Sequence, residues 1–429
     1  GRRCYDGGYH HSRAAVGRAQ PGEGREGMAI TNVRPSRRSM ELPRSPIRQL
    51  MALSDETEAR GTDIISLNIG QPDIPPPPAV VETLRRAAEL PLTYTPSRGI
   101  PDVVNAWRDY YQALSIEVES SDIIVTSGAS EAIQIALLAT CDPGDEVLVP
   151  EPFYAPYTAI ASLVGITVVP VPLAPGFQPP HVDAFRARVT ARTRAILLCS
   201  PNNPTGTVFG YEDLAALASL AREMGLFVLS DETYREIVFD GPPAPSVLSL
   251  PELEDHAVVI DSMSKRFNVC GIRIGSLVSR NAEVTASALQ LAELRLSVPV
   301  VEQIAAAAAL REPSSYITET VVSAYRERRD VALAELRAMP GVVPHEPHGG
   351  FYIAARLPVD DAATFAAWLQ RDVALYGAPV MLTPLSDFFA TPGYGRDAVR
   401  IALVVEPNRL RQAMAILREA LQQYPGRTA

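Results

Sequence analysis

The stretch RAILLCSPNNPTGTVFGYEDLAALASLAREMGLFVLSDETY, residues 194–234, decides the fold of this chain. It begins with a short apolar run, AILLC, and ends with a second one, LFVLS, and both are typical of buried strands. Between them the spacing predicts a helix that ends at Gly225. The apolar face of that helix carries Leu214, Leu217, Leu220, Ala221 and Met224. Two strands joined through a helix form the repeating unit of a parallel sheet.

The same pattern extends to both sides of this stretch. Further strands are predicted within DIIVTSG (122–128), DEVLVPEP (145–152), GITVVPV (165–171), HAVVID (256–261) and IRIGSLVS (272–279). Short, almost wholly apolar strands that alternate with helices predict an α/β fold, a mostly parallel sheet covered on both faces. We therefore expect a three-layer large domain over residues 81–313.

From residue 314 the pattern changes to longer helices and fewer strands. Helices are predicted over 316–339, 361–377 and 408–424, with strands near GGFYIAARL, APVMLT and AVRIALVV. We expect a smaller α+β domain over 314–429, with the Pro-rich segment 40–80 packed beside it. Residues 1–39 are rich in Gly and Arg and lack the apolar core of a signal peptide, so we expect a disordered N-terminal extension.

Composition excludes several classes of function. The net charge of −10 argues against nucleic acid or an anionic membrane surface as a partner, and no run of 18 apolar residues predicts a transmembrane helix. The four cysteines, Cys4, Cys141, Cys199 and Cys270, are widely spaced, which predicts reduced thiols in a cytoplasmic protein. The six histidines have no metal-ligand spacing, so we expect no metal site.

Lys265, in SMSKRFNVCGIRIG at 262–275, is the only lysine in a chain with 39 Lys and Arg residues together. Arginine does not deprotonate in proteins, whereas a desolvated lysine amine can lose its proton and form an imine with an aldehyde or ketone. By itself the count is equally compatible with chance. The neighbouring residues have to decide between these two interpretations.

Polar clusters follow the predicted strands at the edge of the sheet where ligands bind in open α/β folds. TSGAS at 126–130 opens a helix and can present backbone N–H groups to a phosphate. EPFY, SPNNPTG, SDETY and SMSK follow other strands, and they bring Tyr154, Asn203, Asp231, Tyr234 and Lys265. Alone, TSGAS fits an ordinary Gly turn with a Ser cap better than a phosphate site, and each of the other clusters is equally an ordinary turn, cap or core residue. Together they supply what pyridoxal 5′-phosphate (PLP) needs, an amine, an acid, a stacking ring and phosphate donors.

The chain resembles the class I/II aminotransferases, enzymes of fold type I that depend on PLP. The family pattern S-x-S-K-x5-G-x-R-x-G is present at 262–275, N-P-T-G at 203–206 and D-x-x-Y at 231–234. The resemblance runs from LNIGQPD at 67–73 to VRIALV at 399–404, about four-fifths of the chain. It implies transfer of an amino group between an L-amino acid and a 2-keto acid through a Schiff base on Lys265.

The resemblance also implies a role for individual residues. The catalytic residues would be Lys265, Asp231 and Tyr234. Lys265 would form the Schiff base and act as the base in proton transfer, and Asp231 would pair with the pyridine nitrogen. Tyr234 would hold the ring hydroxyl together with Asn203. Tyr154 would stack on the cofactor ring. The phosphate would be surrounded by Ala129, Ser130, Ser262, Ser264 and Arg273.

Three further positions would complete the site. Arg400, in VRIALV, would hold the substrate α-carboxylate together with Asn203, and Gly70 lies where the N-terminal segment of the family closes over substrate. Tyr94 resembles the tyrosine that reaches the phosphate of the neighbouring subunit, which implies a homodimer with shared active sites. Ser130 stands where some aspartate- and prephenate-type members carry Lys, and Arg266 has no role that the resemblance assigns.

The same residues are also compatible with other functions. The cofactor motifs equally fit a PLP-dependent lyase, oxidase or hydroxylase of amino-acid or natural-product metabolism. A regulator with an aminotransferase-like domain would need a DNA-binding domain, and residues 1–39 are too few for one. A nicotinamide dehydrogenase is disfavoured because no predicted strand leads into G-x-G-x-x-G. The sequence does not determine the amino donor, the keto acceptor or the pathway.

Overall fold

The computed structural model describes residues 34–40, 63–87, 89–371, 373 and 378–428. Within these residues, seven strands form a central sheet in the order β2-β8-β7-β6-β5-β3-β4. The strands are β2 (Ile123–Thr126), β3 (Glu146–Glu151), β4 (Thr167–Pro172), β5 (Thr193–Cys199), β6 (Phe227–Asp231), β7 (Ala257–Ser262) and β8 (Gly275–Val278). In this sheet β8 runs antiparallel to β2 and β7, and the other pairs are parallel. The expected mostly parallel α/β sheet is confirmed.

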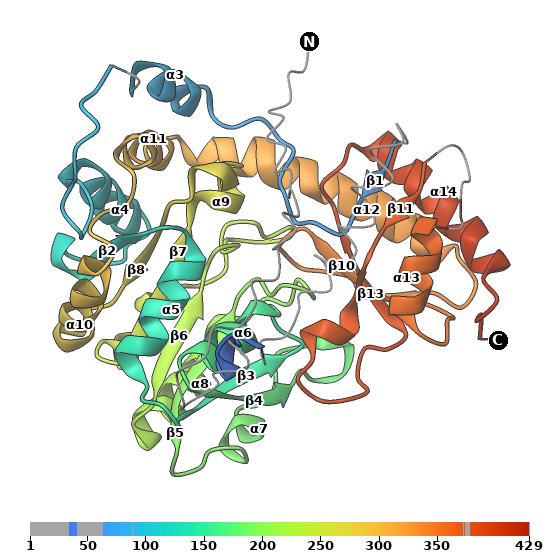
Figure 1. Ribbon diagram of the computed structural model, residues 1–429, viewed down its shortest axis with the longest axis horizontal. Helices are drawn as coiled ribbons and strands as arrows, with labels where there is room; N and C mark the ends of the chain where they lie inside the picture. Colours follow the sequence, from blue (N-terminus) through green and yellow to red (C-terminus); the bar gives the residue numbers. More distant parts are fainter. Residues whose placement is uncertain (1–33, 41–62, 88, 372, 374–377, 429) are drawn as a thin grey trace, which may run out of the picture.

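Helices cover both faces of the sheet (Figure 1). Side chains alternate along a strand, so Val228 and Leu229 of β6 enter two different hydrophobic cores. One core is completed by α5 (Ala129–Thr140), α6 (Pro156–Leu163) and α10 (Ala282–Glu293). The other is completed by α4 (Pro101–Ala113), α7 (Val182–Arg186), α8 (Tyr211–Met224) and α11 (Val300–Leu310), and α3 (Pro78–Ala87) packs on α11. This burial on both faces explains why the strands are almost wholly apolar.

The strand–helix–strand unit of residues 194–234 folds as its pattern predicts. β5 and β6 are parallel neighbours, and α8 joins them. Gly225 ends α8 in the left-handed conformation, with φ of 65°, which glycine adopts without a Cβ clash. Met224, expected on the apolar face, is 38 % exposed because it lies in the last turn beyond the edge of the core.

The smaller domain has an antiparallel sheet, β12-β13-β10-β9. Its strands are β9 (Val343–Pro344), β10 (Tyr352–Arg356), β12 (Thr383–Pro384) and β13 (Ala398–Ala402), and its helices are α12 (Ser323–Arg337), α13 (Ala362–Arg371) and α14 (Pro407–Gln423). Figure 1 shows this domain in orange and red beside the large sheet. The helix predicted over 316–339 begins as a π-helical segment, Tyr316–Val322, and continues as α12.

The N-terminal part of the chain is described only in pieces. Of the N-terminal extension 1–39, residues 34–39 are described, and Arg37–Met40 form the short helix α1. Ser36 stabilises its first turn by accepting from the Ser39 N–H, and the helix lies against α6. Further along, β1 (Ile65–Ser66) pairs in parallel with β11 (Val380–Met381). The domain bounds stay predictions, and residues 1–33 and 41–62 lie outside the described part.

Among the described residues, no helix combines the length and the apolar character needed to cross a bilayer.

Candidate functional site

A cavity of about 250 Å³ lies at the carboxyl ends of β5, β6 and β7. β10 and β13 of the smaller domain close its other side, so the site forms where the two domains meet. Parallel strands bring side chains from distant parts of the sequence together at this edge. The lining residues are Ile69, Gly70, Ala129, Ser130, Ile133, Tyr154, Cys199, Asn203, Asp231, Thr233, Tyr234, Ser262, Ser264, Lys265, Cys270, Arg273, Tyr352 and Arg400.

Lys265 enters this cavity from α9 (Met263–Arg266), the short helix that directly follows β7. Its Nζ donates to the Gly70 carbonyl oxygen at 2.7 Å. Burial lowers the pKa of the Lys265 amine to about 8, and the nearby Arg400 and Arg273 cations act in the same direction. About a tenth of the amine is therefore neutral and nucleophilic at pH 7, far more than for an exposed lysine.

Asp231 stands at the end of β6, on the floor of the same cavity. Its Oδ2 accepts from the Tyr157 hydroxyl at 2.7 Å and its Oδ1 accepts from the Thr233 N–H at 3.1 Å. Burial raises the pKa of the Asp231 carboxyl, while these donors and Lys265 act in the opposite direction. A buried carboxylate held in this way is suited to pair with a cationic group of a ligand.

An anion cradle forms at the N-terminus of α5. Gly128 precedes the helix with φ of 77°, and a Cβ there would lie 2.7 Å from Nη2 of Arg273. A Cβ at Gly275 would lie 2.6 Å from the Asp261 carbonyl oxygen and 3.0 Å from the Ala129 nitrogen. Both glycines therefore let the guanidinium and the free N–H groups of α5 approach one point, where an anion binds well.

Two hydroxyls add to this cradle. Ser262 caps α9 by accepting from the Ser264 N–H at 3.2 Å, and its hydroxyl donates to the Ser264 hydroxyl at 2.9 Å. Both serines line the cavity. The cap holds the backbone of the SMSK turn, which also fixes the position from which Lys265 extends.

Arg400 lies on the opposite wall, on β13, and is 3 % exposed. Its Nη1 donates to Asn203 Oδ1 at 3.1 Å and its Nη2 donates to the Asn68 carbonyl oxygen at 2.5 Å. The guanidinium stacks on the rings of Tyr352 and Phe388, with Cζ 4.4 and 5.0 Å from their centroids. Its Nε has no hydrogen-bond partner among the described residues, so one donor remains free for a ligand.

The remaining wall is aromatic. The Tyr234 and Tyr352 hydroxyls lie 3.0 Å apart, and Tyr154 lines the cavity beside Tyr157. Burial raises the pKa of Tyr154 to about 12 and raises those of Tyr234 and Tyr352 above their ordinary value. The phenols are therefore protonated at neutral pH and serve as hydrogen-bond donors.

Comparison with known proteins identifies the family. A family model described as "Aminotransferase class I and II" matches residues 62–417. The chain belongs to this aminotransferase family. Its relatives include the LL-diaminopimelate aminotransferase of Desulforudis audaxviator, 33 % identical over 90 % of this chain and 97 % of the relative. Another is a probable aspartate/prephenate aminotransferase of Aquifex aeolicus, 32 % identical over 90 % of this chain and 98 % of the relative.

A solved structure agrees with this assignment. The alanine aminotransferase of Pyrococcus furiosus superimposes with a TM-score of 0.83 at 28 % identity, over 91 % of this chain and all of that chain. Other neighbours are aspartate aminotransferases of the same fold. The protein is thus an aminotransferase, and its fold is that of the fold type I enzymes.

Nearly all site residues expected from the sequence of this aminotransferase line the one cavity. The exception is Tyr94, which is 83 % exposed and lies beside a separate groove. Sequence reasoning missed Tyr157 and Tyr352, which contact Asp231 and Tyr234. The signals were present: Tyr157 follows Tyr154 by three residues, and Tyr352 lies in GGFY at the start of a strand.

Arg266, which the resemblance left without a role, lies in the core of the aminotransferase behind Lys265 and is fully buried. Its Nη2 lies 2.9 Å from Asp261 Oδ2, its Nε 3.3 Å from Glu236 Oε2, and its Nη1 donates to the Tyr110 hydroxyl at 3.1 Å. These partners come from β7, from the loop after β6 and from α4. Arg266 therefore joins the segment that carries Lys265 to the segment that carries Asp231.

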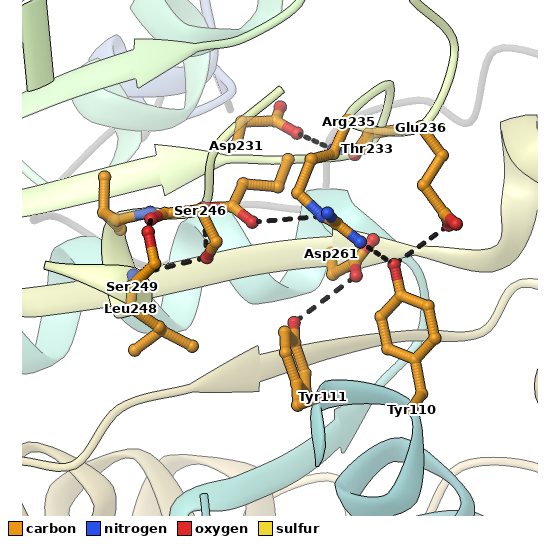
Figure 2. Close-up of polar contacts among 12 residues, drawn as sticks. Tyr110, Tyr111, Asp231, Thr233, Arg235, Glu236, Ser246, Leu248, Ser249 and Asp261 are labelled. Atoms are coloured by element: carbon orange, nitrogen blue, oxygen red, sulfur yellow. Dashed lines mark hydrogen bonds and ion pairs between the residues drawn. The ribbon is translucent and has the colours of Figure 1, made fainter. Parts of the chain in front are cut away.

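Arg235 extends this buried network (Figure 2). It donates to the Tyr110 hydroxyl and lies 3.6 Å from Glu232, while Tyr110 also donates to Glu236 at 2.9 Å. Burial raises the pKa of Glu232 to about 7, and Arg235 opposes that shift. The network lies behind the cavity and does not line it.

A second cavity, of about 830 Å³, is larger, but no lysine lines it. It lies between the loop at 172–177 and the smaller domain, and Pro, Ala and Gly residues form much of its lining. Its arginine, Arg356, is paired with Asp397 at 2.8 Å. The smaller cavity around Lys265 is therefore the candidate active site.

Proposed function

We propose that this aminotransferase binds PLP in the cavity around Lys265 and moves an amino group between an L-amino acid and a 2-keto acid. The observation that carries the proposal is the position of the only lysine of the chain, in a buried cavity with Asp231, Arg273 and Arg400. Three cations face one carboxylate in this lining. That excess of positive charge suits a ligand pair with a phosphate and a carboxylate.

The residues present fit the cofactor at both of its ends. Arg273, Ser262, Ser264 and the N-terminus of α5 at Ala129 and Ser130 offer donors to the phosphate. At the other end, Asp231 offers a carboxylate to the pyridine nitrogen, with Tyr157 and Thr233 holding its two oxygens. Bound there, the cofactor would withdraw electrons from the substrate α-carbon.

Three side chains would hold the ring between these ends. Tyr154 offers an aromatic face for stacking. Asn203 and Tyr234 offer polar groups to the ring hydroxyl. Lys265 would form the covalent link, because its amine is partly neutral near neutral pH.

Arg400 and Lys265 would control the fate of the substrate. Arg400 offers planar donors to the α-carboxylate, with Asn203 beside it at 3.1 Å. A carboxylate held by this guanidinium leaves the α-hydrogen to face Lys265, whose released amine is the base for that proton. Decarboxylation is disfavoured because the carboxylate is clamped, and proton transfer is the expected step.

The test is a half-reaction without acceptor. Under nitrogen, a good amino donor should convert the cofactor absorbance stoichiometrically and release one keto acid per site. Turnover that continues without acceptor, or that requires oxygen, would instead identify a lyase, oxidase or hydroxylase. The names of the relatives cover diaminopimelate, aspartate and glutamate–pyruvate activities, so a panel of amino acids is needed to find the donor.

We also propose a homodimer with shared active sites. Tyr94 and Leu92 are exposed by 83 % and 78 % beside a groove that Ser297 and 298–302 also line. Leu294 and Leu296 are exposed nearby, although Arg295 between them is fixed by Glu131 and the Val125 carbonyl. Exposed apolar side chains that lie together in this way are typical of a protein–protein interface.

Subunit mixing tests the shared site. Tyr94→Ala and Lys265→Ala proteins should each lose most activity. Their equimolar mixture should recover about a quarter of the wild-type rate, since half the dimers are mixed and each mixed dimer has one complete site of two. The measurement is activity after subunit exchange. No recovery on mixing, or a fully active monomer by sedimentation, would contradict the proposal.

The proposed compartment is the cytoplasm. Cys141, Cys199 and Cys270 are free thiols, and free thiols are typical of proteins in a reducing compartment. The net charge of −10 supports small-molecule substrates, and not nucleic acid, as the partners.

A further inference from the structure

Tyr352 contacts three separate parts of the site, although no role was assigned to it from the sequence. It begins β10, where it pairs with Ala402 of β13, and Arg400 pairs with Ala354 two residues along. Residues two apart share a face of a strand, so Tyr352 is the diagonal neighbour of Arg400 on one face of the smaller sheet. The Arg400 guanidinium carbon lies 4.4 Å from the Tyr352 ring centroid.

The hydroxyl of Tyr352 reaches the other two parts. It lies 3.0 Å from the hydroxyl of Tyr234, which belongs to the large domain. A Cβ at Gly70 would overlap the Tyr352 hydroxyl, so the N-terminal segment also packs directly against it. Tyr352 is 2 % exposed and lines the cavity.

We propose that Tyr352 is a positioning residue with two separable roles, its ring holding Arg400 for the substrate carboxylate and its hydroxyl orienting Tyr234 toward the cofactor. The inference rests on the proposed function. If Tyr234 donates its proton to the cofactor ring oxygen, its own oxygen is free to accept from Tyr352. Both phenols are buried and protonated at neutral pH, so either hydroxyl can donate across the 3.0 Å between them, and donation from Tyr352 to Tyr234 follows only once Tyr234 donates to the ring oxygen.

Tyr352→Phe tests the hydroxyl. Without the Tyr352 donor, Tyr234 becomes a weaker donor, and the form of the bound cofactor with more charge on its ring oxygen is disfavoured. The midpoint of the cofactor absorbance titrated with pH should therefore rise by about 0.5–1 unit, the size expected for one neutral hydrogen bond. KM for the amino acid should change by less than about twofold, since the ring remains on Arg400.

Tyr352→Met tests the ring, because it keeps a large apolar side chain and removes the aromatic face. KM for both the amino acid and the keto acid should rise about 5- to 30-fold, the range for a buried cation–π contact. If the Met variant does not fold, Tyr352→Leu is measured in the same way. A KM within about twofold of wild type in a folded variant would overturn the ring role.

Tyr325→Phe is the matched control. Tyr325 is also fully buried and stacks on Phe351, the neighbour of Tyr352, but its hydroxyl has no hydrogen-bond partner in the described part of the chain and it does not line the cavity. It should change neither the titration midpoint nor KM. A merely structural effect of removing a buried phenol would instead appear equally in both Phe variants.

A double-mutant cycle with Tyr234→Phe completes the test. The titration shift caused by Tyr352→Phe should disappear in the Tyr234→Phe background, because the hydroxyl acts through Tyr234. An equal shift in both backgrounds would overturn the hydroxyl role. These outcomes are separate from the proposed function, which fails if the wild-type protein itself gives no half-reaction.

Discussion

Lys265→Arg protein is expected to keep its fold and its positive charge but to lose the covalent link to the cofactor. Arginine is not an amine nucleophile and does not deprotonate in proteins, so it can neither hold the cofactor nor accept the α-proton. Loss of the general base alone costs about 10²–10⁴-fold in rate, and loss of the nucleophile adds to that. Activity should therefore fall by roughly 10⁴-fold or more.

Borohydride reduction followed by mass spectrometry measures the covalent link directly. Wild-type protein should carry one cofactor per chain on the peptide with Lys265, and the variant should carry none. The variant has no lysine at all, because Lys265 is the only one in the sequence. A cofactor still fixed to the Lys265→Arg chain would show that the lysine assignment is wrong.

The amine pKa of about 8 gives this prediction a pH dependence. Imine formation requires the neutral amine, so cofactor uptake by cofactor-free wild-type protein should accelerate as pH rises through 8 and level off by about pH 9. An exposed lysine, with its pKa near 10.4, would still accelerate well above pH 9. Acceleration that continues to pH 10 would contradict the buried environment that we describe for Lys265.

Arg266→Met is expected to destabilise the fold by about 3–5 kcal/mol, the usual cost of removing one partner from a buried ion pair. Asp261, which is fully buried, would lose its direct ionic partner at 2.9 Å, and Glu236, whose side chain is 9 % exposed, would lose its partner at 3.3 Å. The free energy of unfolding in urea measures the loss. Arg311→Met is the control, because its pair with Asp102 is half-exposed and is worth at most about 1 kcal/mol.

The loss of stability in Arg266→Met protein should depend on pH. Burial already raises the pKa of Asp261, and without Arg266 it rises further above its unfolded value. An acid whose folded pKa is raised stabilises the fold at low pH and loses that contribution as pH increases through the folded pKa. The deficit of the variant should thus be larger at pH 8 than at pH 5. An equal deficit at both values would mean that lost packing, and not charge, causes it.

The order of strands and helices around the site was predictable because it depends on local patterns. The apolar runs at 195–199 and 226–230 and the helix between them are marked by residues a few positions apart. Each strand of a parallel sheet ends at the same edge, so Asp231 and Lys265 were predictable as neighbours in space. The end of α8 was also predictable from a local signal, because a single glycine, Gly225, marks it.

The sequence by itself determined the strands, the helices and the chemical groups that follow them, including the lone lysine. Only the tertiary structure decided which other side chains meet those groups. Tyr157 reaches Asp231 across 74 residues and Tyr352 reaches Tyr234 across 118 residues, through the packing of separate helices, strands and domains. Arginine usually lies on the surface, so the sequence does not indicate that Arg266 is buried. Only the tertiary structure brings it against Asp261, Glu236 and Tyr110. Such contacts depend on packing between elements far apart in the chain, and no periodicity along the sequence encodes them.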